Sequence, residues 1–98
     1  MAGSAATAQV RRDGDALVFS GALLRAGVTA LWKQVGAPAG VRRLDLRAVE
    51  RLDSAGLALL AELAARAGGE VAIDGEPAGL AELRAAYRLT PGLAFAAA

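Results

Sequence analysis

The fold of this protein is decided by residues 43–67, which read RLDLRAVERLDSAGLALLAELAARA. Within this stretch, residues 43–47 alternate Leu with charged residues, which predicts a short, half-buried β-strand. A tight segment follows at 48–52, and the sequence DSAG at 53–56 opens a helix that is almost entirely Leu and Ala. We therefore expect a strand that leads directly into a helix.

The start of this helix is a polar corner. The first turn of a helix leaves several backbone N–H groups without partners, and their dipoles make a small positive pole. Asp53 and Ser54 are residue types that accept hydrogen bonds from such groups. From local chemistry alone the sequence predicts a capped helix, with Ser54 bonded to its own helix.

The same stretch resembles the signature of the STAS domain, the family of sulfate transporters and anti-sigma-factor antagonists. The residues that carry the resemblance are Asp45-Leu46, Val49, residues 52–60, Leu31-Trp32 and residues 83–89. Within the family, the chain is most similar to the stand-alone (MlaB-like) STAS subunits of Mla phospholipid-transport ABC complexes. The resemblance extends from about residue 16 to residue 92.

The order of the remaining elements agrees with this family. Strands are expected at 8–11 and 16–20, joined by a turn at Asp13-Gly14 and ended by Gly21. A helix from Leu24 is expected to stop at Gly36, Pro38 and Gly40. A strand at 70–74, a helix from 80 that closes at Thr90-Pro91, and a short apolar tail at 93–95 complete the chain. We expect one α/β domain over residues 1–98, a STAS fold with a mixed sheet of about four strands and three or so helices, and a flexible tail at 1–6.

The resemblance implies a non-catalytic accessory subunit. Such a protein would bind the cytoplasmic ATPase of an ABC transporter that moves phospholipids for outer-membrane lipid asymmetry, and would stabilise its active form. The residues expected to contact this partner are Trp32, Arg51, Asp53, Ser54, Ala55, Gly56 and Tyr87. The helix from Ser54 is apolar over most of its circumference, which favours either packing on two sides or a face for another protein.

Two aromatic residues have an alternative interpretation. Trp32 lies on the apolar stripe of its helix, and Tyr87 shares a face with Leu80 and Leu83, so local patterning is compatible with core packing of both. For Tyr87 this pattern predicts a core tyrosine with its hydroxyl at the rim. The family resemblance places both residues at the ATPase contact instead.

A second hypothesis is a phosphoswitch of the anti-sigma-antagonist type. Ser54 occupies the position of the serine that a partner kinase phosphorylates, so it is the candidate phosphoacceptor, and the partner would be a serine kinase or anti-sigma factor. An added charge of about −1.5 to −2 would block an apolar interface. Ala55 departs from the second Ser common in that subfamily, and Trp32 and Tyr87 favour the Mla hypothesis. Direct lipid carriage finds no support, because a chain of this length leaves little room for an acyl cavity.

Composition excludes several other functions. The net charge is +1, from 11 basic and 10 acidic residues, so no nucleic-acid-binding surface is indicated. Neither Cys nor His occurs, which excludes disulfides, the usual zinc sites and a His-based catalytic triad. No base is available to activate Ser54, and no phosphate-binding loop follows the first strand. We expect no enzyme activity, metal or cofactor, and a soluble cytoplasmic protein without a membrane segment.

Overall fold

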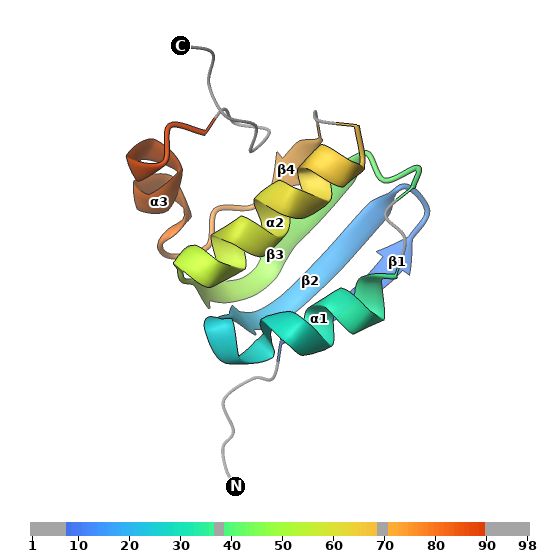
Figure 1. Ribbon diagram of the computed structural model, residues 1–98, viewed down its shortest axis with the longest axis horizontal. Coiled ribbons are helices and arrows are strands. Elements are labelled where there is room, and N and C mark those ends of the chain that lie inside the picture. The colour runs from blue at the N-terminus through green and yellow to red at the C-terminus, as the bar shows by residue number, and fades with distance from the viewer. Residues whose placement is uncertain (1–7, 37–38, 69–70, 90–98) are drawn as a thin grey trace, which may run out of the picture.

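The computed structural model describes residues 8–36, 39–68 and 71–89 of the chain (Figure 1). The elements are, in order, β1 (Gln9–Asp13), β2 (Ala16–Leu23), the short 3-10 helix η1 (Arg25–Gly27), α1 (Val28–Val35), β3 (Arg43–Leu52), α2 (Ser54–Arg66), β4 (Ala72–Asp74) and α3 (Leu80–Ala86). The predicted tail at 1–6, Pro38, Thr90-Pro91 and the apolar segment 93–95 lie outside the described residues. α3 already ends at Ala86, so the prediction that this helix closes at Thr90-Pro91 is wrong.

The four strands form one sheet in the order β1-β2-β3-β4. β1 and β2 make an antiparallel hairpin around Gly14, whereas β2–β3 and β3–β4 pair in parallel. The parallel pairs require crossovers, which α1 and α2 supply. The predicted α/β architecture, a mixed sheet with three helices, is confirmed.

One face of the sheet carries the hydrophobic core. Figure 1 shows α1 and α2 side by side over this face, with α3 beside the start of α2. The buried residues are mostly leucines and come from both layers: Leu17, Phe19, Leu23, Leu31, Leu44, Leu46, Leu57, Leu60, Leu63 and Leu80. Each fully buried side chain of this size contributes about 1.5–3 kcal/mol relative to exposure. The leucines of residues 43–67 thus hold α2 against β3.

The strands are longer than the alternation predicts. β2 continues through Gly21 to Leu23, and β3 continues to Leu52, so the predictions that Gly21 ends the pairing and that 48–52 is not strand are wrong. The register between β2 and β3 shifts after Val18 and again after Gly21, which has φ +82°. In β3 the buried positions pass from Leu44 and Leu46 to Val49 and Leu52, so a count of period two fails there, whereas the alternation of β2 continues to Leu23.

Two element starts also differ from the prediction. Residues 25–27 form η1, and α1 begins at Val28, so Gly27 precedes the helix rather than weakening its interior. β4 begins at Ala72 within the predicted 70–74 segment, of which residue 70 is not described. These boundaries are set by packing rather than by local preference.

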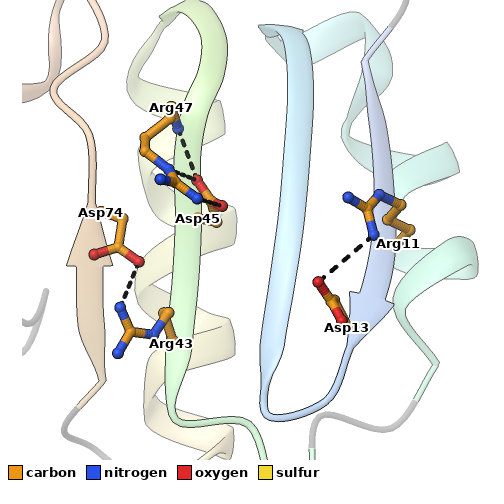
Figure 2. A network of polar contacts seen from close by, with 6 residues as sticks. All are labelled: Arg11, Asp13, Arg43, Asp45, Arg47 and Asp74. Atoms are coloured by element: carbon orange, nitrogen blue, oxygen red, sulfur yellow. Dashed lines mark hydrogen bonds and ion pairs between the residues drawn. The ribbon is translucent and has the colours of Figure 1, made fainter.

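The other face of the sheet is charged, and the helices lie behind it in Figure 2. Three acid–base pairs occupy this face: Arg11–Asp13 at 3.9 Å, Arg43–Asp74 at 2.8 Å and Arg47–Asp45 at 2.8 Å. Asp45 also accepts a hydrogen bond from the backbone N–H of Arg47. The hydrogen bonds from Arg47 lower the pKa of Asp45 to about 2. This face is a solvated surface of mixed sign, as the interleaved charges predict.

Candidate functional site

The ends of three elements meet where β3 turns into α2. Asp53 is the single residue between these two elements. Its backbone N–H donates to the carbonyl of Leu23 at the end of β2, at 3.2 Å. The N–H of Leu52 donates to the carbonyl of Ala78, just before α3, at 3.1 Å. The first turn of α2 is therefore held at a fixed place between η1 and α3.

The Asp53 carboxylate binds two separate backbone segments. Its Oδ1 accepts from the N–H of Gly56 in the first turn of α2 at 2.9 Å, which is an N-cap. Its Oδ2 accepts from the N–H of Arg25 in η1 at 3.0 Å. The predicted cap is confirmed, but Asp53 makes it. No hydrogen bond of the Ser54 hydroxyl occurs among the described residues, so the expected bond from Ser54 to its own helix is wrong.

These bonds keep Asp53 ionised. Burial raises the pKa of Asp53, and the hydrogen bonds that Gly56 and Arg25 donate lower it by more, so the net pKa is below its ordinary value. Both carboxylate oxygens are thus occupied by backbone groups. Asp53 is a structural residue of this corner and not a free acid or base.

Gly56 lies inside the corner rather than on its surface. A Cβ atom at this position would come within 2.1 Å of the Leu23 carbonyl oxygen. Real Cβ atoms do not approach backbone oxygen so closely, so only glycine lets α2 pack on the end of β2. Gly56, which the sequence placed among the partner contacts, is buried against its own chain.

Tyr87 lies at the far side of the same corner. It follows α3 as its C-cap, and 49% of the residue is exposed. The core tyrosine predicted from the shared face with Leu80 and Leu83 is therefore wrong. Arg88, the next residue, has φ +56°, so the chain leaves the helical direction directly after Tyr87.

An open groove of about 500 Å³ lies between the start of α2, the end of α3 and η1. Its lining residues are Arg25, Asp53, Ser54, Ala55, Leu57, Ala58, Ala61, Tyr87 and Leu89. Four of these, Asp53, Ser54, Ala55 and Tyr87, are among the residues that the sequence predicted. The groove is mostly apolar, with a hydroxyl-bearing rim.

The remaining lining residues were not predicted. Ala58 and Ala61 follow Ser54 at helical spacing, so the periodicity of α2 contains the signal for them. Arg25 and Leu89 come from other elements and are brought to the groove only by the fold. No local pattern marks Arg25, which is 28 positions before Asp53.

Two predicted residues lie elsewhere. Trp32, on α1, is half-buried against the core, and the guanidinium of Arg66 lies 5.0 Å from its ring centroid. Arg66 is the last residue of α2, 12 positions and about 18 Å along the helix axis from Ser54. Arg51 is exposed on β3 and does not line the groove. Trp32 and Arg51 thus lie outside the groove.

Within the groove, the carboxylate next to Ser54 in sequence is not free to act as a base. A serine needs a neighbouring base to act as a nucleophile, and the carboxylate of Asp53 is already bonded to two backbone N–H groups. Among residues 8–36, 39–68 and 71–89, no three carboxylates gather as a metal site would require. In the same described part of the chain, no helix has the length and apolar character needed to cross a bilayer.

A family model described as "Mlab, STAS domain" matches residues 7–93. The chain belongs to this MlaB-type STAS family. The match covers the whole described sheet and all three helices, so the observed architecture is the STAS fold. In this STAS domain the DSAG sequence is the corner at which β3 turns into α2. A search of curated proteins found no match to the chain.

Proposed function

We propose that this STAS domain is a non-catalytic accessory subunit of an Mla-type ABC transporter. It binds the cytoplasmic ATPase subunit and stabilises the assembled, active conformation. The transporter moves phospholipids and so maintains outer-membrane lipid asymmetry. The membership of the MlaB-type family supports the choice of partner. The chain itself binds neither nucleotide nor lipid.

One observation carries this proposal: the exposed, mostly apolar groove at the start of α2. Tyr87 stands half-exposed at one wall, and Ser54 and Ala55 form the other. Partly exposed aromatic residues beside small apolar ones are typical of the anchors of protein interfaces. The small side chains of Ala55, Ala58 and Ala61 permit a partner element to approach the helix closely.

The proposed action follows from binding alone. A subunit without chemistry changes an ATPase only if it binds one conformation of the enzyme more tightly than another. Asp53 supports this role because it fixes the first turn of α2 against η1. A rigid docking corner loses little conformational entropy when the partner binds.

The test is co-purification with the ATPase subunit of an Mla-type transporter. The wild-type chain should form a stable complex, and Ser54→Arg should weaken it at least about tenfold, because the long cationic side chain fills the groove. ATPase activity of the transporter should fall in parallel.

Ala72→Arg is the matched control, since Ala72 is exposed on β4 and does not line the groove. This variant should bind as the wild type does. Both variants should unfold with the same midpoint as the wild type. Binding by Ser54→Arg at wild-type strength would contradict the proposal.

A second candidate, regulation by phosphorylation of Ser54, is favoured by one feature of the groove. Ser54 is exposed and its hydroxyl makes no hydrogen bond within the described chain, and Arg25 lines the same groove. A phosphate on Ser54 would meet both the positive pole of α2 and the Arg25 guanidinium. The mass of the intact, natively expressed protein distinguishes the two candidate functions. An added phosphate on Ser54, together with recovery of a serine kinase, favours regulation by phosphorylation.

A further inference from the structure

The groove is lined by one basic residue, Arg25, whose side chain forms no ion pair within the described part of the chain. Arg25 begins η1, one residue after the end of β2, and lines the groove together with Tyr87 and Leu89. The ion pairs of residues 8–36, 39–68 and 71–89 involve five other arginines: Arg11, Arg43, Arg47, Arg66 and Arg84. Among these described residues, no carboxylate lies within ion-pair distance of the Arg25 side chain.

The position of Arg25 is fixed even though its side chain is exposed. Its backbone N–H donates to the Asp53 carboxylate at 3.0 Å, which ties η1 to the first turn of α2. Arg25 therefore stands at a constant place relative to Ser54. Any substitution at residue 25 other than proline keeps this backbone N–H, so the side chain can be changed without losing the hydrogen bond between η1 and Asp53.

The single acid of the groove, Asp53, forms no ion pair with the Arg25 side chain. Asp53 directs both oxygens to the backbone N–H groups of Gly56 and Arg25. Its negative charge also faces the positive pole at the start of α2. Arg25 thus lines the groove together with the apolar residues Leu57, Ala58 and Ala61.

We infer that Arg25 is the charged anchor of this groove, and that the segment of the ATPase subunit that lies in it carries a carboxylate opposite Arg25. The inference rests on the proposed function and adds the chemistry of the contact. The occupant is an amphipathic segment whose apolar side chains meet these apolar residues of α2 and whose Asp or Glu pairs with the guanidinium. Arginine binds a carboxylate in a bidentate geometry, through two parallel hydrogen bonds. The pair therefore sets the position of the segment along the groove as well as the charge that the segment must carry.

Charge complementarity also excludes the opposite kind of segment. A lysine or arginine at this place would meet both Arg25 and the positive pole of α2, and like charges in contact oppose association. Arg25 thus selects among partners of equal hydrophobicity. This makes it a specificity determinant of the interface.

The experiment measures binding of the full chain to the purified ATPase subunit at low and high salt. Arg25→Gln should lower affinity about tenfold, and Arg25→Glu at least about thirtyfold, with slower association at low salt. Arg42→Glu is the matched control: Arg42 is exposed at the opposite end of β3, outside the groove, and its variant should change affinity less than about twofold. Circular dichroism and thermal unfolding check that each variant is folded.

The decisive arm is a charge reversal in the ATPase subunit. One Asp→Lys or Glu→Lys substitution there should restore binding to Arg25→Glu and weaken binding to the wild type. If Ser54→Arg abolishes the complex while Arg25→Glu behaves as Arg42→Glu does, the inference fails and the proposed function stands. If no acidic position of the partner rescues Arg25→Glu, the inference fails as well. If Ser54→Arg binds normally, the proposed function itself fails.

Discussion

Asp53 joins two parts of the chain through one carboxylate. Its Oδ1 caps α2 at Gly56, and its Oδ2 holds the N–H of Arg25. A helix cap typically contributes about 1 kcal/mol to stability. The second hydrogen bond gives the backbone N–H of Arg25 a partner that it would otherwise lack. Asp53 is thus the structural centre of the corner.

Substitution of Asp53 should lower stability in two steps. Asp53→Asn keeps one carbonyl oxygen and loses one of the two bonds, which should cost about 0.5–1 kcal/mol. Asp53→Ala loses both and should cost about 1–2 kcal/mol. Urea denaturation measures both values. Ser54→Ala, the control next to it, should change stability by less than about 0.5 kcal/mol, because the Ser54 hydroxyl makes no hydrogen bond within the described chain.

The pH dependence of this contribution has a definite sign. Because the folded pKa of Asp53 lies below its ordinary value, its stabilising effect is complete above the unfolded value of about 4 and is lost as the pH falls through the folded pKa. The difference in stability between the wild type and Asp53→Ala should therefore shrink below about pH 4. A constant difference down to pH 2 would contradict the ionised, doubly bonded carboxylate.

At the scale of the element, the main feature of α2 is the close packing of its first turn against the end of β2. Leu57, Leu60 and Leu63 fill the core, whereas Ser54 and Ala58 stay at the surface. The close approach depends on Gly56, which faces the end of β2. Gly79, at the start of α3, has the same relation to the end of β3: a Cβ there would come within 2.7 Å of the Leu52 carbonyl oxygen.

Gly56→Ala should therefore be destabilising although alanine favours helix. The added methyl group would meet the Leu23 carbonyl, so α2 must shift, at a cost of about 1–3 kcal/mol or more. Gly27→Ala is the matched control, because its Cβ would make only an ordinary contact of 3.5 Å with Ala8. Thermal unfolding should separate the two variants clearly. Equal stability of Gly56→Ala and the wild type would show that the helix does not need this approach.

At the scale of the whole molecule, the two aromatic residues predicted to flank one site lie at opposite ends of α2. Tyr87 lines the groove at the start of the helix, and Trp32 packs under Arg66 at its end. Both can contact a partner only if that partner covers the length of the helix. The proposed interface is therefore larger than the groove.

This arrangement predicts additive effects on binding to the ATPase subunit. Trp32→Ala and Tyr87→Ala should each weaken the complex, and the double variant should lose the sum of the two losses within about 0.5 kcal/mol, since the residues share no contact. Calorimetric titration of the wild type, the two single variants and the double variant completes this double-mutant cycle. Trp32→Ala should also lower the unfolding midpoint, because the ring packs against the core, whereas Tyr87→Ala should not.

The sequence by itself determined the order of the elements, the mixed α/β sheet and the family. The spacing of the leucines and the DSAG sequence are properties of single segments, so they indicate the same elements however those elements pack together. It also determined that Asp53 and Ser54 stand at the head of α2. Its errors concern Gly21, which does not end β2, and the end of β3, where the side-chain phase changes after Leu46.

Only the tertiary structure decided which residues share the groove. Arg25 comes to Ser54 through a backbone hydrogen bond to Asp53, and Tyr87 stands half-exposed at the end of α3. The same packing removed Gly56 from the surface and separated Trp32 from the corner. A groove is a relation among elements far apart in the chain, and its residues are specified by contacts that no single segment encodes.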